Sequence, residues 1–246
     1  AHEIKGFSSD TYLLECGAGV KISNIDKYRL DIAVALSVPN VRISRTLVEY
    51  QGKTYLAIEA NKKRTEDLLW DAAHITGHNI PIGMDNYRNV VTWNLDNHST
   101  PHMLICGATG SGKSVCIRST IEYARAAGIN DIVVFDPKYE FCDIHGIRCY
   151  NEIEDIEDVM KGLVEQMQAK AKARTKQKIT LVIFDEFADA IAQARSGKAL
   201  EGDKSLEENL RILAQKGRSL GYRIIAATQR ASTKIITGVI KGNLPS

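Results

Sequence analysis

The sequence has 246 residues, of which 44% are apolar and 25% charged, as in ordinary soluble proteins of one large domain or two modest ones. The formal net charge of +2 excludes a polybasic tail, so any contact with nucleic acid must use a local patch or small patches pooled by several subunits. No apolar stretch approaches the roughly 18 residues of a membrane span, and no signal peptide is visible. We therefore expect a cytoplasmic segment without membrane contact, although a longer parent protein could carry an anchor elsewhere.

The cysteines are odd in number, are scattered along the chain, and form no C-x-x-C pair. We interpret them as reduced core thiols of a cytosolic protein. They are Cys16, Cys106, Cys116, Cys142 and Cys149.

Residues 1–98 are expected to form a small α/β domain. A helix is predicted from a cap at Ser23 to about Ser37, with Asp26 completing a weak form of the capping box. Short β-rich runs predict strands, and Gln51-Gly52-Lys53 predicts the turn between two of them. The predicted strands cover residues 12–15, 41–43, 47–50, 54–60 and 90–93.

Residues 99–246 alternate strands with helices, a pattern that predicts a parallel sheet with crossover helices. The strands are near-continuous apolar runs, as expected for strands covered on both faces. They cover residues 103–106, 131–135, 180–184 and 223–227. A long helix is predicted over residues 153–174, with acids in its first turns and bases in its last, which suits the helix dipole.

The most informative stretch is G-x-x-x-x-G-K-S at residues 107–114, between the strand at 103–106 and a helix-like run at 115–127. In this context the pattern predicts a phosphate-binding loop. Its glycines let backbone N–H groups turn toward a phosphate chain, and the helix N-terminus adds partial positive charge there. Lys113 would reach the β- and γ-phosphates of ATP, and the Ser114 hydroxyl would hold Mg²⁺. The expected nucleotide contacts are Gly107, Ala108, Thr109, Gly110, Ser111, Gly112, Lys113, Ser114 and Val115.

Two acids end the apolar strand at residues 180–184. Asp185 would fix Mg²⁺, accepting from a water on the metal or from Ser114, and Glu186 would polarise the attacking water. A nucleotide kinase needs no water-activating base, so the second acid favours hydrolysis. Asp136 ends the preceding strand without a second acid, and we assign it a structural or relay role.

Gln229 comes shortly after the strand at residues 223–227. A polar residue there would lie beside the phosphate-loop strand and face the γ-phosphate. We expect Gln229 to be a sensor that hydrogen-bonds the attacking water or the γ-phosphate and reports hydrolysis. The alternative is a solvated strand end.

Several stretches together resemble the motor domain of the FtsK/SpoIIIE DNA translocases, and the first unit resembles the small α/β domain that precedes that motor. The motor stretches are residues 100–114, 135–138, 185–189, 213–218, 227–230 and 236–241. Those of the first unit are residues 19–25, 35–38 and 58–64. The resemblance implies a RecA-like P-loop ATPase core with a mainly parallel sheet. It also implies a ring, usually a homo-hexamer, with ATP between subunits and double-stranded DNA in the central channel.

The sequence departs from the family in three ways. Motors of this family continue well beyond residues 236–241, so we expect the motor to be C-terminally incomplete at residue 246. Ala231 stands where the family usually has proline, and residues 195–208 look longer than in the cell-division members. The last two features indicate a divergent branch, such as one serving a mobile element.

The resemblance also offers candidates for contacts between subunits and with DNA. Arg218 and Arg230 are candidates for an arginine that reaches the γ-phosphate of the adjacent subunit, and we slightly favour Arg218. The alternative for each is a surface salt-bridge residue. After the acid strand, a glycine-containing loop would point into the channel, where its basic residues would meet phosphates and not base edges. These residues are Arg195, Lys198 and Lys204. A basic run at residues 61–64 is either a solvated loop or a second contact with nucleic acid or a neighbouring subunit.

The predicted function is ATP-driven translocation of double-stranded DNA. One alternative is a secretion or conjugation coupling ATPase that moves protein or nucleoprotein. Another is a nucleotide-dependent scaffold that binds ATP without turnover. The presence of Glu186, a candidate for activating water, argues against the scaffold.

Overall fold

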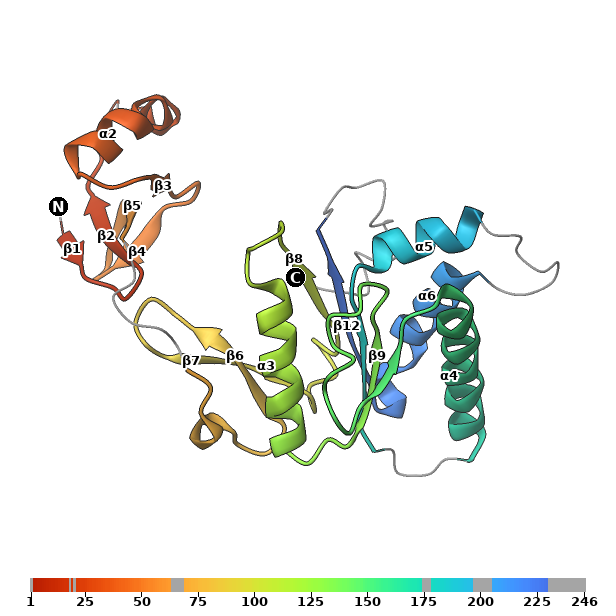
Figure 1. Ribbon diagram of the computed structural model, residues 1–246. Helices are drawn as coiled ribbons and strands as arrows, with labels where there is room; N and C mark the ends of the chain where they lie inside the picture. The colour runs from red at the N-terminus through yellow and green to blue at the C-terminus, as the bar shows by residue number, and fades with distance from the viewer. Residues whose placement is uncertain are drawn as a thin grey trace. The chain divides into compact units, whose positions relative to one another are not determined.

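The computed structural model describes residues 2–17, 19, 21–62, 69–173, 178–196 and 205–229. The chain divides into two compact units, drawn in Figure 1. The first comprises Ala1–Trp70 and Gly83–Val91, and the second Asp71–Ile82 and Thr92–Ser246. Residues 71–82 and 92–98, which precede the predicted domain boundary, therefore pack with the second unit.

The first unit is built on an antiparallel sheet in the order β1-β2-β5-β3, with β4 paired to β5. Gln51 and Gly52 connect β4 to β5, both with positive φ (51° and 75°), as the tight turn of a hairpin requires. The strands are β1 (His2–Ile4), β2 (Ser9–Leu14), β3 (Val41–Ile43), β4 (Val48–Tyr50) and β5 (Lys53–Asn61).

The helix predicted from Ser23 is present but is divided and begins earlier. It comprises α1 (Ile22–Ile25), η1 (Asp26–Tyr28) and α2 (Arg29–Ala35). Its N-cap is Lys21, whose side chain makes no capping bond, so the predicted Ser23–Asp26 capping box is wrong. Ala33 of α2 packs in one apolar cluster with Val41, Ile43, Leu56, Ile58 and Ala60, so this helix covers one face of the sheet.

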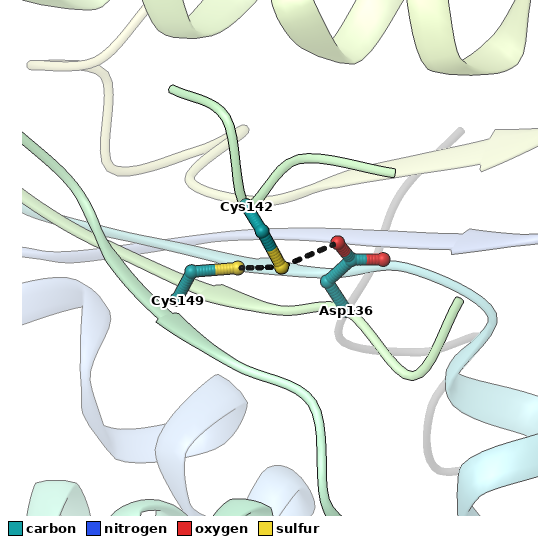
Figure 2. Close-up of side chains that lie close together, drawn as sticks. All are labelled: Asp136, Cys142 and Cys149. Atoms are coloured by element: carbon teal, nitrogen blue, oxygen red, sulfur yellow. Dashed lines mark hydrogen bonds between the residues drawn. The ribbon is translucent and has the colours of Figure 1, made fainter. Parts of the chain in front are cut away.

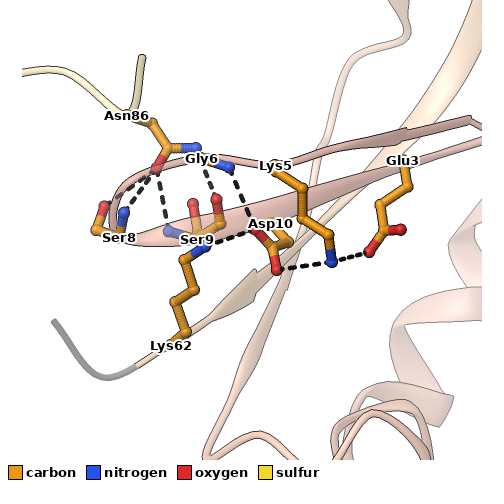
Figure 3. Close-up of polar contacts among 8 residues, drawn as sticks. All are labelled: Glu3, Lys5, Gly6, Ser8, Ser9, Asp10, Lys62 and Asn86. Carbon is orange, nitrogen blue, oxygen red and sulfur yellow. Dashed lines mark hydrogen bonds and ion pairs between the residues drawn. The ribbon is translucent and has the colours of Figure 1, made fainter. Parts of the chain in front are cut away.

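Asn86 joins residues 83–91 to the start of β2 (Figure 3). Its Oδ1 accepts from Ser8 N at 2.9 Å and Ser9 N at 3.0 Å, and its Nδ2 donates to Ser9 O at 2.8 Å. Nearby, Asp10 accepts from Lys62 Nζ at 2.8 Å and from Lys5 Nζ at 3.3 Å. Lys62 of the predicted basic run is thus held in an ion pair, while residues 63 and 64 lie outside the described part of the chain.

The second unit contains a five-stranded parallel sheet in the order β10-β9-β11-β12-β8. The strands are β8 (Met103–Cys106), β9 (Asp131–Phe135), β10 (Arg148–Tyr150), β11 (Thr180–Phe184) and β12 (Tyr222–Thr228). The helices are α3 (Lys113–Ala126), α4 (Ile153–Ala173), α5 (Phe187–Ser196) and α6 (Leu206–Lys216), with the short η3 (Arg218–Leu220) before β12. The predicted α/β fold with a parallel sheet is confirmed.

Helices cover both faces of this sheet, as Figure 1 shows. On one face, Val133 and Val182 pack with side chains of α4, α5 and α6. On the other, Val134 and Ile183 pack with Ile117 of α3. Because successive strand residues point to opposite faces and both faces are buried, the strands read as continuous apolar runs.

A two-stranded sheet, β6 (Asn79–Met84) and β7 (Val90–Asn94), follows the short η2 (Ala72–His74). Ile80, Trp93 and Leu95 from this region are buried in the same cluster as α3. Among the helices of the described residues, none has the length and apolar character needed to cross a membrane.

Candidate active site

The strand order brings the predicted catalytic segments to one edge of the parallel sheet. Strand β12 lies between β8 and β11, with Thr228 opposite Cys106 and Ala226 opposite Phe184. The carboxyl ends of parallel strands meet at the same sheet edge. The loop after β8, the acids after β11 and Gln229 after β12 therefore lie side by side.

The loop from Gly107 to Gly112 has the backbone that its sequence predicts. Gly110 and Gly112 adopt φ of 78° and 91°, in the left-handed region that favours glycine. Gly112 is the N-cap of α3, which begins at Lys113. The loop is tied to β12, since Gly107 N donates to Thr228 O at 3.2 Å. Thr109 Oγ1 also lies 3.2 Å from Gln229 Oε1.

Lys113 is buried between the two acids that follow β11. Its Nζ donates to Asp185 Oδ1 and lies 3.4 Å from Glu186 Oε2. Burial lowers the pKa of Lys113, but its bonds and charge interactions with Asp185 and Glu186 outweigh this and raise it. Burial raises the pKa of Asp185, and Lys113 offsets only part of that effect. The ammonium group is therefore charged at neutral pH and sits where both carboxylates can reach it.

Glu186 is 1% exposed, and four donors hold its carboxylate. Oε1 accepts from Thr228 Oγ1 and from Gln229 N, both at 3.0 Å. Oε2 accepts from Lys138 Nζ at 2.9 Å. Burial alone would raise the pKa of Glu186, but the bonds from Gln229, Lys138 and Thr228 lower it to about 2. The side chain is thus ionised and fixed at neutral pH.

The backbone of Glu186 is also unusual, with a φ of 47°. A positive φ in a residue other than glycine is uncommon and persists where the surroundings enforce it. It occurs here at the junction between β11 and α5, where the chain turns directly from strand to helix. At this junction the acid meets the ends of β12 and of β9, from which three of its four donors come.

Three residues at this site were not predicted from the sequence: Lys138, Glu140 and Thr228. Lys138 and Thr228 bind Glu186 as described. Ser114 was expected near Asp185, but its Oγ donates to Glu140 Oε2. Lys138 and Glu140 follow Asp136-Pro137, an acid–proline pair at the end of a strand. This pair was the sequence signal that the segment after the strand contributes to the site.

The site contains oxygen donors of the kind that Mg²⁺ prefers. Asp185 Oδ2 is buried and has no hydrogen-bond partner among the described residues. The Ser114 hydroxyl and the Glu140 carboxylate add two further oxygen groups. Carboxylate and hydroxyl oxygens suit this hard cation, so the residues present fit the predicted metal.

Asp136 ends β9 and fixes the segment that follows it. Its Oδ2 accepts from Phe141 N at 2.7 Å, and its carbonyl accepts from Asn151 Nδ2 at 2.6 Å. Arg118 of α3 supports the same segment through Asp143 Oδ2 at 3.0 Å, with its guanidinium 5.5 Å from the Phe141 ring centre. Lys138 and Glu140 therefore project from an anchored segment.

The remaining predicted residues lie elsewhere. Arg218 is exposed in η3, before the amino end of β12, with Nη1 3.4 Å from His98 O. It lies at the opposite sheet edge from Glu186 and takes no part in the site of its own chain. Arg195 ends α5, but its side chain is not described. Lys198, Lys204 and Arg230 fall outside the described residues.

Two family models match the chain. The model of the FtsK/SpoIIIE family matches residues 66–127. The model of the ATPase family associated with various cellular activities (AAA) matches residues 103–241, more than half of the chain.

Curated relatives match nearly the whole chain. This chain is 30% identical to the DNA translocase FtsK of Borreliella burgdorferi, over 99% of its own length and 34% of that protein. It is 31% identical to FtsK of Caldanaerobacter subterraneus over 98% of this chain and 37% of that protein. For the DNA translocase SftA of Bacillus subtilis the identity is 27%, over 100% of this chain and 28% of that protein. The chain thus spans about a third of the length of these relatives.

Solved structures share the fold. The pCW3 conjugation coupling protein TcpA with ATPγS has a TM-score of 0.65, at 22% identity over 100% of this chain and 75% of that one. The cytoplasmic domain of the type VII secretion ATPase EccC from Thermomonospora curvata has a TM-score of 0.56, at 17% identity over 75% of this chain and 23% of that one. Sequence motifs, fold and relatives agree, and the chain belongs to the FtsK/SpoIIIE family of P-loop ATPases.

Proposed function

We propose that this chain is the motor of an ATP-driven translocase of double-stranded DNA. The observation that carries the enzymatic part is the carboxylate of Glu186, which is buried, ionised and fixed by Lys138, Thr228 and Gln229 beside a phosphate-binding loop. A scaffold that binds ATP without turnover has no need of such an acid.

ATP binding would use the loop, the N-terminus of α3 and Lys113. The loop N–H groups and the helix dipole offer positive potential to the phosphates. Lys113 would exchange its bond with Asp185 for the β- and γ-phosphates, which leaves Asp185 free to bind the cation. Bound Mg²⁺ would neutralise charge on these phosphates, held by Ser114 and Asp185.

Glu186 would then orient and polarise the attacking water. A carboxylate with a pKa near 2 is a weak proton acceptor, so its first contribution is to accept a hydrogen bond from water and fix its position. Movement of Lys113 toward phosphate removes a cation now 3.4 Å from Glu186 Oε2 and so strengthens the acid as a base. Phosphate binding and activation of the base are coupled through this lysine.

Gln229 is placed to report the state of the nucleotide. Its side-chain oxygen contacts Thr109 of the loop, and its backbone N–H donates to Glu186. A change at the γ-phosphate would therefore reach both the base and the chain that continues from β12. We propose this sensor role from these two contacts.

The DNA part of the proposal draws on the relatives that are named DNA translocases. In a homo-hexameric ring, Arg195, Lys198 and Lys204 would hold the DNA backbone in the channel. Arg218 would act on the ATP of a neighbouring subunit, which suits its distance from the site of its own chain. The rival function is a coupling ATPase that moves protein.

The test is the ATPase rate of the protein with and without duplex DNA of several unrelated sequences. We expect stimulation by every duplex, since a motor must pass any sequence. Hydrolysis that duplex DNA leaves unchanged would favour the protein-moving alternative. ATP binding without hydrolysis would favour the scaffold.

A further inference from the structure

Two thiols and a carboxylate meet beside β9 and β10, apart from the contacts of Glu186 (Figure 2). Cys142 lies between the two strands and Cys149 within β10, and their sulfur atoms are 3.7 Å apart. Cys142 Sγ is 3.9 Å from Asp136 Oδ2. The three potential ligand atoms all lie within 4.8 Å of one another. In the described part of the chain, this is the one group of three or more such side chains.

The two separations at Cys142 are close to the edges of a tetrahedral zinc site. With Zn–S bonds of about 2.3 Å and Zn–O bonds of about 2.1 Å, tetrahedral angles place two sulfurs about 3.8 Å apart and sulfur and oxygen about 3.6 Å apart. The observed 3.7 and 3.9 Å need only small side-chain adjustments. Asn151 Nδ2, 3.0 Å from Cys142 Sγ, already donates to that sulfur, as partners outside the ligand shell do.

The carboxylate supplies a second observation that points to a cation. Asp136 is fully buried, and the oxygen nearest Cys142 Sγ is its Oδ2, which accepts a hydrogen bond from Phe141 N, while Oδ1 has no hydrogen-bond partner among the described residues. A buried carboxylate charge with so few hydrogen bonds is costly, and a cation on the second lone pair of Oδ2 would offset that cost. Cys142 is exposed, so an ion can enter from solvent.

We propose that Asp136, Cys142 and Cys149 bind a thiophilic divalent cation, with zinc as the ordinary occupant and water as the fourth ligand. Burial, and then the bond from Cys142, raise the pKa of Cys149 to about 12, so zinc must displace thiol protons. A disulfide would instead draw the sulfurs from 3.7 Å to about 2.05 Å and would leave the carboxylate uncompensated. The buried carboxylate beside the thiols therefore favours a metal site over a disulfide.

The site would stabilise the segment that serves the nucleotide site. Residues 137–141 carry Lys138 and Glu140, which bind Glu186 and Ser114. A metal at Asp136 and Cys142 would fix this segment at both ends. The proposal does not depend on which substrate the motor moves.

The test uses the whole protein, reduced with a phosphine that does not bind zinc. Zinc would be titrated in competition with a chromophoric chelator, and cobalt would be added separately to look for a thiolate charge-transfer band. We expect about one ion per chain, release of close to two protons per ion, and a cobalt band. The Cys142→Ser/Cys149→Ser double variant should bind zinc at least about a hundredfold more weakly and lose the band.

The matched control is Cys16→Ser/Cys106→Ser, which removes two other thiols and should bind zinc as the wild type does. Circular dichroism establishes that the variants are folded. Equal zinc affinity in both double variants would overturn the proposal. It would also be overturned if the reduced wild type retained no zinc while hydrogen peroxide linked Cys142 to Cys149, as peptide mapping would show.

Discussion

Glu186, Lys113 and Lys138 form one charged network, in which a buried carboxylate is shared by two lysines. A carboxylate at a solvated strand end would be mobile and would titrate near its ordinary pKa. Here four hydrogen-bond donors fix it, and they come from the phosphate loop helix, β12 and the segment after β9. The acid and the residues that hold it therefore have different roles, which substitutions can separate.

Glu186→Gln should keep ATP binding and lose hydrolysis by about a hundredfold or more, the scale expected for a base that activates water. Glutamine preserves size but cannot polarise water as a carboxylate does. ATP affinity by calorimetry and single-turnover hydrolysis measure the two effects. Glu122→Gln, an exposed change in α3, is the control. Near-normal turnover in Glu186→Gln would remove this residue from the mechanism.

Lys138→Met should lower kcat by about tenfold or more with little change in ATP affinity, because Lys138 donates to Glu186 Oε2 and so positions that acid. The loss of this cation should also raise the pKa of Glu186 and shift the acid limb of the kcat–pH profile upward. Lys172→Met, an exposed change in α4, should leave both parameters unchanged. A defect confined to KM, with an unshifted pH profile, would contradict the positioning role.

At this scale the sequence predicted the residues that share a short motif and missed those that come from other segments. Lys113, Asp185 and Glu186 are marked by a local pattern, and the structure brings them together. Lys138 and Thr228 reach Glu186 only because β9 and β12 flank β11, and a single sequence does not show that order. Glu140 replaced Asp185 as the partner of Ser114 for the same reason.

At the scale of elements, most strands were predicted close to their observed bounds, whereas β1, β6 and β10 were not predicted. Strands β8, β9 and β11 have the predicted bounds, because a buried parallel strand is a continuous apolar run. Strands β1 (His2–Ile4) and β10 (Arg148–Tyr150) lack the two β-branched residues that marked the equally short β3 (Val41–Ile43), which has its predicted bounds. The start of the helix predicted from Ser23 was wrong, because the expected cap, Ser23, lies inside the first turn of a helix that begins at Ile22.

His102 joins three elements of the second unit and gives its stability a defined pH dependence. Its Nε2 donates to Ala214 O of α6 at 2.8 Å, and its Nδ1 accepts from Ile224 N of β12 at 3.1 Å. Burial lowers the pKa of His102 from 6.5 to about 4, against a smaller opposing effect of the bond to Ala214. The folded protein therefore holds this ring neutral.

The unfolded chain binds a proton at this residue below pH 6.5, whereas the folded chain binds it only below about 4. Stability should therefore fall as the pH drops through this window, by about 3 kcal/mol from His102. Urea unfolding at several pH values measures the slope. His102→Gln should flatten it, whereas the exposed His145→Gln should not. An unchanged slope in His102→Gln would show that another group is responsible.

At the scale of the whole molecule, the net charge of +2 leaves DNA binding to local patches repeated around a ring. Lys62 does not offer a simple patch, since it pairs with Asp10. The loop residues Arg195, Lys198 and Lys204 remain the proposed contacts.

Changing Arg195, Lys198 and Lys204 together to glutamine should weaken binding of unrelated duplexes equally, because phosphate contacts carry no sequence information. The log–log salt dependence should become shallower by about 0.9 for each DNA phosphate that an engaged subunit no longer neutralises. The rate of ATP hydrolysis without DNA should be unchanged. The control changes the exposed Lys172 and Lys216 to glutamine. Wild-type affinity and salt slope in the loop variant would show that this loop does not hold DNA.

The most direct test of the proposed function is displacement of a third strand from a duplex of arbitrary sequence. We expect the protein to release the third strand when ATP is hydrolysed. We expect no release by the wild-type protein with ATPγS or by the Glu186→Gln variant with ATP. In both cases the protein should still bind the duplex. Hydrolysis of ATP at a DNA-stimulated rate without release of the third strand would contradict translocation along DNA.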